Sequence, residues 1–470
     1  MSVLLDQNKN YNAQFGPIFR SSAIFYIPRD VKTTITVSNY WDFKNNLEVG
    51  LLFSIRKLSG ELVERRELYF NDGLVINESK WPIEEGSVEV EAFGNKNLRI
   101  PYAAVMGVYE TEASITMVHS YGRNHNLIEI EDRSSLTSGR ESCWTIRQDN
   151  DVENKAVFHN GHLGVPNQIA KFTLTNVEGA EHSTDFSMPL LEPFETFVFN
   201  LSEIVPQYKD FLSGSDGWGT LHFENKTAFT RLLLVWQNKL TGELQVTHSN
   251  FDYSEIETNK IEATKPAIMK WPSILTQSDS GQVVLYPKFS KGIYKITSNK
   301  SITETDKGLF IKTKDIDALE FTSLDKNTIP SRIVTGITYQ KEKNTLPLEC
   351  SMGIVHEKRP PKRFHWAVVS KKFKSRLFFN AFTEIYQVPD DLFIVFRLYT
   401  AKRNQYVEKR LDIQSLNEIP DGIYIDELFA NIDQSGHEDY CYVSMFSNFG
   451  GLLMYSSMQK KSSMTIEHSF

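Results

Sequence analysis

The chain has 470 residues and a mass of 54.0 kDa, more than one hydrophobic core usually serves, so roughly three or four domains are expected. Hydrophobic residues make up 40% of the sequence and charged residues 23%, which excludes an intrinsically disordered chain. The formal net charge of −8 argues against a general binder of double-stranded nucleic acid, because such proteins carry a surplus of Lys and Arg.

The chain start and the cysteines indicate a compartment. The first residues, MSVLLDQNKNYNAQF, lack the basic start and apolar run of a secretory signal, and no stretch approaches the roughly 18 apolar residues of a membrane span. Cys143, Cys350 and Cys441 lie far apart, which is typical of free thiols in a reducing environment. We therefore expect a cytoplasmic protein without membrane insertion, or one that reaches the cell surface by a route without a cleaved signal.

Short alternating strands dominate the sequence, and helical periodicity is nearly absent. Taken in chain order, four segments open with a period-2 strand that runs into Asn: TTITVSN, AKFTLTN, IYKITSN and SRLFFNAF. A later strand in each segment leads into a polar turn, as in GLVINESKW, TFVFNLSEIVP and GIYIDELFANI, with ALEFTSLDKN as the weakest match. Asn77, Asn200 and Asp426 are predicted to cap these turns through their side-chain oxygens.

Each segment closes with a hairpin that ends on histidine. The four hairpins are AAVMGVYETEASITMVHS, RLLLVWQNKLTGELQVTHS, RIVTGITYQKEKNTLPLECSMGIVHE and GLLMYSSMQKKSSMTIEHS. The aromatic residues taken as equivalent are Tyr109, Trp236, Tyr339 and Tyr455, and the histidines are His119, His248, His356 and His468. The histidines recur at intervals of 129, 108 and 112 residues, about one small domain each. Ser follows the histidine in three copies and Glu357 in the third, which is therefore the degenerate copy.

This repeat predicts an all-β fold, a tandem array of about four antiparallel immunoglobulin-like β-sandwich domains. The predicted domains are residues 15–123, 150–254, 268–357 and 362–470.

The four repeated histidines allow two interpretations. They, or a subset of them, meet at domain junctions and coordinate a metal ion such as zinc, for which neutral imidazole is a common ligand. Alternatively, each histidine has a structural role, ending the last strand of its sandwich and bonding the chain that enters the next domain. Because domains on a string hold equivalent positions far apart, the structural interpretation is favoured.

Two smaller patterns also raise the question of chemistry. His159 and His162, in HNGHLG, are a candidate metal pair, but no recognisable third ligand is close to them in the sequence. Cys441 has His437 and Glu438 nearby, yet on a strand positions 437 and 441 lie roughly 13 Å apart, too far for direct activation of the thiol. No phosphate-binding loop, nucleophile elbow or dinucleotide motif is present, so the sequence favours a protein without catalytic residues or cofactor.

One stretch departs from the balanced charge of the chain. Lys358 to Arg376 contains eight basic residues and no acidic residue, with aromatic residues interleaved. Such a stretch can bind phosphates or acidic sugars. The candidate anion-binding residues are Lys358, Arg359, Lys362, Arg363, Trp366, Lys371 and Lys372. The competing interpretation is a solvated domain joint followed by a strand whose lysines protect an exposed edge.

The sequence favours a non-catalytic binding or scaffold protein whose partner is an anionic polysaccharide or another protein. One alternative is an enzyme of surface-glycan metabolism with an interdomain site that includes His119, His125, His159 and His162. Another is a structural component of a virion or appendage.

Overall fold

The computed structural model describes residues 19–45, 47–70, 73–94, 104–124, 141–223, 225, 228–251, 260–276, 282–285, 294–298, 310–314, 316–324, 328–330, 334–340, 345–430 and 440–468. Within these ranges all paired strands are antiparallel, and they form four β-sandwiches. The predicted all-β array of antiparallel sandwiches is therefore confirmed.

Helices are few and short in the described ranges, and none is long and apolar enough to cross a membrane. They are α2 (Tyr40–Asn45), α4 (Leu201–Ile204), α5 (Tyr208–Leu212), α6 (Ser273–Thr276), α7 (Ile425–Leu428) and the 3-10 turn η2 (Leu416–Glu418).

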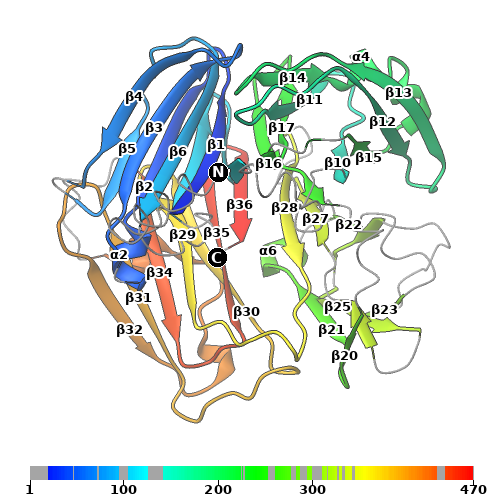
Figure 1. Cartoon of the computed structure of the whole chain (residues 1–470). Coiled ribbons are helices and arrows are strands. Elements are labelled where there is room, and N and C mark those ends of the chain that lie inside the picture. Colours follow the sequence, from blue (N-terminus) through cyan, green and yellow to red (C-terminus); the bar gives the residue numbers. More distant parts are fainter. Residues whose placement is uncertain are drawn as a thin grey trace, which may run out of the picture.

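Each sandwich has a central sheet, whose last strand lies against those of other sandwiches, and a flanking sheet. Figure 1 shows two of these last strands, β28 and β36, near the middle of the molecule. The first flanking sheet contains β1 (Phe19–Ile27), β6 (Gly86–Gly94), β3 (Gly50–Lys57) and β4 (Leu62–Leu68), and the first central sheet β5 (Val75–Glu78), β2 (Lys32–Ser38), β7 (Val105–Glu110) and β8 (Ile115–His119). The second flanking sheet contains β19 (Asn250–Phe251), β10 (Glu141–Ile146), β15 (Gly217–His222), β12 (Gln168–Thr175) and β13 (Glu181–Met188), and the second central sheet β14 (Thr196–Asn200), β11 (Val152–His159), β17 (Leu233–Asn238) and β18 (Leu244–His248).

The third and fourth sandwiches follow the same plan. The third flanking sheet contains β21 (Ala267–Lys270), β25 (Ala318–Ser323) and β23 (Tyr294–Ser298), and the third central sheet β24 (Phe310–Lys312), β22 (Gln282–Leu285), β27 (Val334–Tyr339) and β28 (Leu348–Gly353). The fourth flanking sheet contains β29 (Phe364–Ser370), β34 (Tyr440–Ser447), β31 (Phe393–Tyr399) and β32 (Val407–Asp412), and the fourth central sheet β33 (Ile423–Tyr424), β30 (Lys374–Ala381), β35 (Leu452–Lys460) and β36 (Ser463–His468). The short strands β9 (Gly122–Asn124) and β16 (Ala228–Thr230) extend the first flanking sheet, and β20 (Lys260–Glu262) pairs with β26 (Thr328–Pro330).

The four sandwiches share one topology. When the strands of a sandwich are counted in chain order, the flanking sheet reads 1-6-3-4 and the central sheet 5-2-7-8, the third sandwich lacking strand 4 among its described residues. An immunoglobulin constant-type domain has the orders 1-2-5-4 and 3-6-7. The strand pairs 2-5 and 3-6 are common to both arrangements, whereas strands 1 and 7 pair differently.

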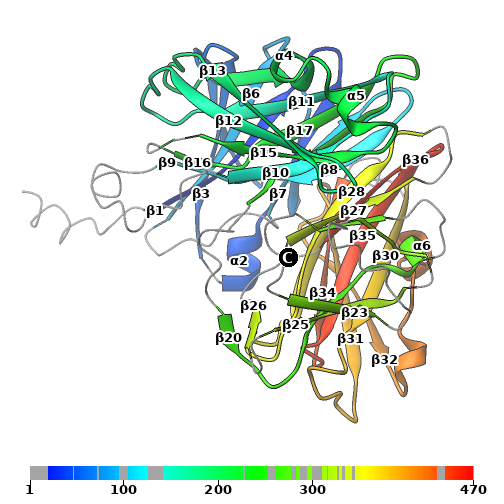
Figure 2. The ribbon, with the colours of Figure 1, turned by 90° about the vertical axis from the view of Figure 1, so that its right-hand side faces the viewer.

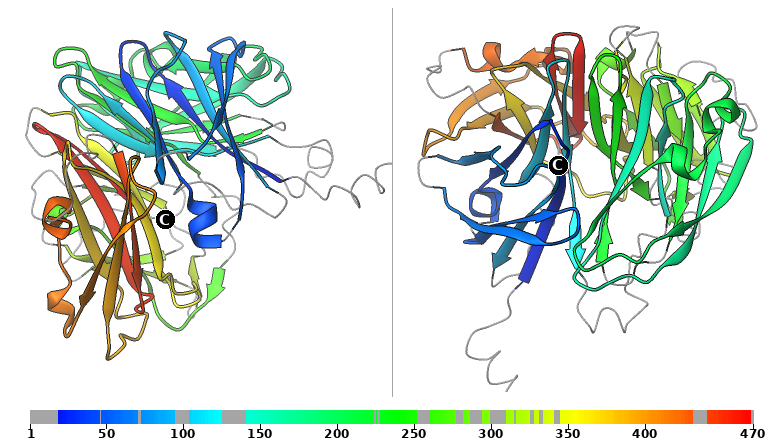
Figure 3. Two further views of the ribbon diagram at one scale, coloured as in Figure 1. Left: turned by 90° about the vertical axis from the view of Figure 1, so that its left-hand side faces the viewer. Right: turned by 90° about the horizontal axis from the view of Figure 1, so that it is seen from above.

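The sandwiches are arranged as a closed ring around the strands β8, β18, β28 and β36, which we call the central strands. Figure 2 shows β8, β28 and β36 close together. β8 lies against β18 and β36, and β28 lies against β36 and β18. Seen from above, the first and fourth sandwiches form one half of the molecule and the second and third form the other (Figure 3). The expectation that equivalent positions lie far apart is therefore wrong, because the domains do not follow one another along a line.

Side chains connect the central strands where main-chain pairing is absent. Polar residues five and three positions before the terminal histidines reach the main chain of the neighbouring sandwich. These bonds join Ser114 Oγ to Leu244 N (2.8 Å), Thr116 Oγ1 to Val246 N (3.2 Å), Glu243 Oε2 to Leu346 N (2.7 Å), Gln245 Nε2 to Met464 O (3.3 Å), Ser463 Oγ to Ile115 N (3.4 Å) and Thr465 Oγ1 to Met117 N (3.2 Å). The repeated S-x-T of SITMVHS and SMTIEHS thus holds neighbouring sandwiches together.

Aromatic residues of β34 form the interface between the fourth and first sandwiches. Tyr440 donates to Glu110 Oε1 at 2.7 Å, and Tyr442 lies 3.0 Å from the carbonyl oxygens of both Thr36 and Ala104. Cys441, between them, points to the opposite face of the strand and is buried in the core of the fourth sandwich. Alternation along one strand therefore separates an interface from a core.

Several sequence alignments of the repeat need correction. Strands β2 and β30 are equivalent, but AKFTLTN and IYKITSN form β12 and β23, which are third strands and not second strands. Likewise ALEFTS forms β25, a sixth strand, and β24 holds the fifth-strand position in the third sandwich. The three segments were mismatched because alternating strands from the two sheets of a sandwich look alike in sequence.

The predicted caps give a mixed result. Asn200 accepts from Ser202 N at the start of α4, as predicted. Asp426 lies inside α7, whose N-cap is Tyr424, and Asn77 is a strand residue that donates to Tyr440 O at 2.8 Å. The predicted domain limits stay predictions.

Candidate functional site

Three of the four repeated histidines meet where the central strands converge. The ring centres of His119 and His248 are 4.3 Å apart, and those of His119 and His468 are 5.2 Å apart. Each residue is the last of its central strand, so the ring of sandwiches brings together positions that are more than a hundred residues apart in the chain. His119 and His248 are buried, whereas the His468 side chain is 28% exposed.

Arg231 lies between the first two of these histidines. Its Nη1 is 3.0 Å from His119 Nε2, and it lies 3.2 Å from Nε2 and 3.5 Å from Nδ1 of His248. Because a guanidinium only donates hydrogen bonds, His119 Nε2 must accept, and the His119 ring carries its proton on Nδ1. In His248 the shorter contact is also to Nε2, which assigns the same tautomer to this ring. The Nδ1 partners agree with this assignment, since His119 Nδ1 faces Glu467 Oε1 at 2.9 Å and His248 Nδ1 faces the Ser249 carbonyl oxygen at 2.9 Å.

Burial and nearby positive charge keep His119 neutral. Loss of hydration lowers the pKa of His119 well below 6.5, and His248, His468 and Arg231 lower it further. A neutral imidazole can accept from Arg231 and donate to Glu467 at the same time. The cluster is therefore a hydrogen-bonded network in which the buried Arg231 guanidinium is held by ring nitrogens of His119 and His248.

A metal ion competes with this network for the same atoms. His119, Glu467 and His468 place ligand atoms within 4.8 Å of one another, the only such group of three among the described residues. A metal on His119 Nδ1 would move the ring proton to Nε2, where it would oppose the N–H of Arg231. The arrangement consequently fits a metal only if Arg231 moves away.

The third copy of the repeat contributes a serine in place of the histidine. Tyr109 pairs with Thr116 and Trp236 with Gln245, each three residues before the histidine. Tyr339 pairs with Leu348, so the matching position is Ser351, and His356 lies five residues further along the chain. In the fourth sandwich Met458 holds the position of the aromatic, and Tyr455 pairs with His468 itself. The equivalences proposed for His356 and Tyr455 are therefore wrong.

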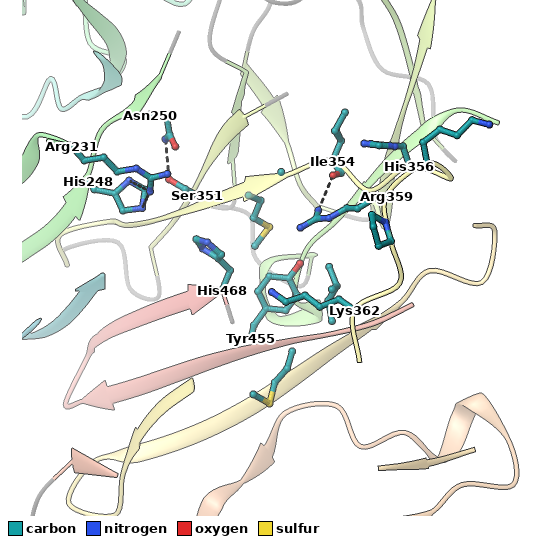
Figure 4. A pocket seen from close by; sticks show the side chains of 16 residues that line it. Arg231, His248, Asn250, Ser351, Ile354, His356, Arg359, Lys362, Tyr455 and His468 are labelled. Carbon is teal, nitrogen blue, oxygen red and sulfur yellow. Dashed lines mark hydrogen bonds between the residues drawn. The ribbon is translucent and has the colours of Figure 1, made fainter. Parts of the chain in front are cut away.

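A pocket of about 510 Å³ opens beside the network, between the second, third and fourth sandwiches (Figure 4). We call it the central pocket. Its inner wall includes Arg231, His248, Asn250 and Ser351, and Asn250 Nδ2 donates to Ser351 Oγ at 2.9 Å. At the opposite end His356 and Arg359 face the cavity, and Tyr455 and His468 lie across it.

The start of the predicted basic stretch forms one side of this pocket. Lys358, Arg359 and Lys362 all line it. The segment is held in place, since Arg359 N donates to His356 O at 3.0 Å and Lys362 N donates to Gly450 O at 3.0 Å. Arg359 Nη1 also lies 3.3 Å from the Ile354 carbonyl oxygen, and the Tyr386 hydroxyl donates to Arg359 O at 2.9 Å. Hydrogen bonds thus hold in place the segment 358–362, whose three basic side chains line the pocket.

The remainder of the stretch lies elsewhere. Arg363 is exposed outside the pocket, and Trp366 is 1% exposed, packed among aromatic side chains of the first and fourth sandwiches. Lys371 Nζ lies 3.9 Å from Asp426, and Lys372 Nζ lies 3.3 Å from Glu110. The structure therefore divides the seven predicted residues into three at the pocket and four away from it.

His159 and His162 are not brought to this site. His159 is buried, with Nδ1 2.9 Å from Thr196 Oγ1, and burial lowers its pKa to about 3. His162 is partly exposed, and neither residue belongs to the group of three ligands found in the described ranges. His125, His437 and Glu438 lie outside the described residues.

Sequence reasoning missed Arg231, Asn250, Ser351 and Glu467. Glu467 directly precedes His468, and Asn250 follows His248 by two positions. Their closeness to repeated histidines in the sequence could have indicated that they belong to the site. Arg231 begins the closing hairpin of the second copy, but only the ring of sandwiches brings it to His119.

No protein-family model matches the chain, and no curated protein matches it. Among solved structures, the tetra-tandem repeat in the extending region of a large adhesion protein aligns at 8% identity, covers 90% of each chain and gives a TM-score of 0.11. At that TM-score the likeness carries no argument, so the function must be argued from the site.

Proposed function

We propose that the protein is a non-catalytic binding protein that receives an anionic ligand in the central pocket. The observation that carries this proposal is the charge of the lining: Arg231, Lys358, Arg359 and Lys362 line the pocket, and none of its described lining residues is acidic. Cations that converge on a concave surface attract and orient anions.

The size and character of the pocket support a ligand of limited size. A volume of about 510 Å³ falls within the range of pockets for small molecules, roughly 300 to 1,000 Å³. It suits a compact molecule or the end of an acidic glycan chain. The second, third and fourth sandwiches also serve as the scaffold that fixes the pocket at their junction.

The experiment compares two pairs of basic residues from the same stretch. Lys358→Gln with Arg359→Gln removes two charges from the pocket, and Lys371→Gln with Lys372→Gln removes two charges from outside it. Binding of oligogalacturonate and of pyrophosphate is measured by isothermal titration calorimetry. We expect the pocket pair to weaken binding about tenfold or more and the control pair to change it by less than about twofold.

Two results would overturn the proposal. Equal losses in both double variants would mean that overall charge, and not the pocket, attracts the anion. Unchanged thermal stability of the wild-type protein with both ligands at millimolar concentration would mean that no anion binds the folded state, since such binding raises the unfolding midpoint by mass action.

A further inference from the structure

We propose that the anionic group received by the central pocket is a terminal phosphate ester, carried on a small organic body. This inference rests on the proposed function and specifies its ligand.

The first argument is the number of fixed charges. Lys358 and Arg359, side by side in the lining, carry two positive charges at neutral pH. His356 adds none, because burial and the nearby Arg359 lower its pKa from 6.5. A single carboxylate would offset one of these two charges, whereas a phosphate monoester carries about −1.5 to −2. The lining thus matches a group with more than one negative charge.

The second argument is the set of donors at the buried end. Ser351 Oγ accepts from Asn250, which leaves the serine hydroxyl hydrogen to donate to a ligand oxygen. Arg231, next to it on the inner wall, is a planar donor suited to phosphate oxygens. The lysines at the opposite side add point charges. A terminal phosphate offers three oxygens to these three kinds of donor, and a carboxylate offers only two.

The third argument is the apolar wall. Met352, Ile354, Pro360, Leu453, Met454 and Tyr455 complete the lining of the pocket. The Tyr455 ring is buried and held by its hydroxyl, which donates to Lys270 O at 3.1 Å. Inorganic phosphate alone would leave this wall uncovered, whereas the body of a phosphate ester would cover it.

The test uses ligands that differ in one feature. Calorimetry at about pH 7.5 compares glucose 6-phosphate, glucuronate, glucose and the phosphodiester glycerophosphoglycerol. We expect glucose 6-phosphate to bind about tenfold more tightly than glucuronate or the phosphodiester, and glucose not to bind. The phosphodiester separates a free terminal phosphate from one inside a polymer or a lipid headgroup.

Substitutions locate the phosphate. Ser351→Ala and Arg231→Gln should each weaken glucose 6-phosphate binding about fivefold to tenfold and change glucuronate binding by less than about threefold. Ser351→Ala is the decisive variant, because it preserves the histidine network that Arg231→Gln disturbs. Asn404→Ala, on an exposed loop away from the pocket, is the control.

The two proposals can fail separately. If glucuronate or the diester binds as tightly as the monoester, or if Ser351→Ala has no effect, the phosphate inference is wrong while anion binding at Lys358 and Arg359 still stands. If none of the anions binds, or if Lys358→Gln with Arg359→Gln leaves their affinities unchanged, the proposed function itself is wrong.

Discussion

Arg231 in the second sandwich donates a hydrogen bond of 3.0 Å to Nε2 of His119 in the first, 112 residues earlier in the chain. The same guanidinium contacts His248, and Glu467 from the fourth sandwich completes the network on the far side of His119. Three sandwiches thus share one buried polar cluster, and its protonation state bears on how firmly they are joined.

The stability of the protein should depend on the protonation of His119. The folded state holds the pKa of His119 well below 6.5, whereas the unfolded chain titrates near 6.5. The unfolded state therefore binds more protons, and the free energy of unfolding falls as the pH drops below about 6.5. In His119→Gln, whose amide retains a donor and an acceptor, this loss should be smaller. The urea midpoint measured between about pH 8 and pH 5 checks it.

The matched control is His182→Gln, at an exposed position. It should retain the pH dependence of the wild type. His159, whose pKa is about 3, makes the free energy of unfolding depend on pH in all three proteins. The difference in this pH dependence between the proteins therefore reports on His119. Parallel curves for wild type and His119→Gln would contradict the role assigned to this histidine.

Zinc should bind only after the arginine is removed. In Arg231→Ala the Nε2 atoms of His119 and His248 lose their donor, while His468 and Glu467 remain beside them. We expect zinc to raise the thermal midpoint of this variant reversibly with chelator, and to leave the wild type unchanged. Stoichiometric zinc in the wild-type protein would show that Arg231 does not block the site.

The side-chain bonds between central strands should contribute measurable stability. Thr116 is 1% exposed, and its hydroxyl bonds both N and O of Val246 in the neighbouring sandwich, at 3.2 and 3.1 Å. Thr116→Val retains the shape but removes both bonds, which should lower the free energy of unfolding by about 1 to 3 kcal/mol. The half-exposed Thr173, paired with Ser183, is the control, and Thr173→Val should cost less than about 0.5 kcal/mol.

The interface between the fourth and first sandwiches offers a second test of stability. Removing the Tyr442 hydroxyl leaves the carbonyl oxygens of Thr36 and Ala104 without this donor. Tyr442→Phe should lower the free energy of unfolding by about 1 to 2 kcal/mol, which is measured as a lower thermal midpoint. The same change at Tyr406, which is 43% exposed, should have little effect. If Tyr442→Phe leaves the free energy of unfolding unchanged, the packing of side chains alone holds this interface.

The three thiols should not react with thiol reagents in the folded protein. Cys143, Cys350 and Cys441 are all buried, and burial raises the pKa of Cys350 well above 9.0. A thiol reagent should therefore label none of them at neutral pH and all three after unfolding in denaturant. Rapid labelling of the folded protein would mean that a core opens and exposes a cysteine that is buried in this structure.

The repeat in the sequence predicted the sandwiches because alternation, turns and hairpins are local signals. It did not predict the ring, because closure depends on contacts such as Arg231 with His119, which no local pattern encodes. The same limit applies to the site. Lys358, Arg359 and Lys362 were found as a charge anomaly, but their separation from Lys371 and Lys372 follows from where the chain turns at β29 and β30.

The third copy shows why a histidine was assigned wrongly. In its closing strand Ser351 holds the position that histidine holds in the other copies. His356, five residues later, was assigned to this position because it also follows a strand. Only the pairing of Tyr339 with Leu348 fixes the register, because a repeat in sequence does not specify the residue opposite.

The central strands are all edge strands of their sheets, and an open edge is a template for pairing with another chain. In this molecule each edge lies against neighbouring central strands, and serine, threonine and glutamine side chains bond β8, β18 and β36 to one another, so the ring conceals four surfaces prone to aggregation without merging them into one continuous sheet. A fragment that lacks any one sandwich would uncover two of these edges, and the intact ring is consequently the smallest unit expected to remain monodisperse.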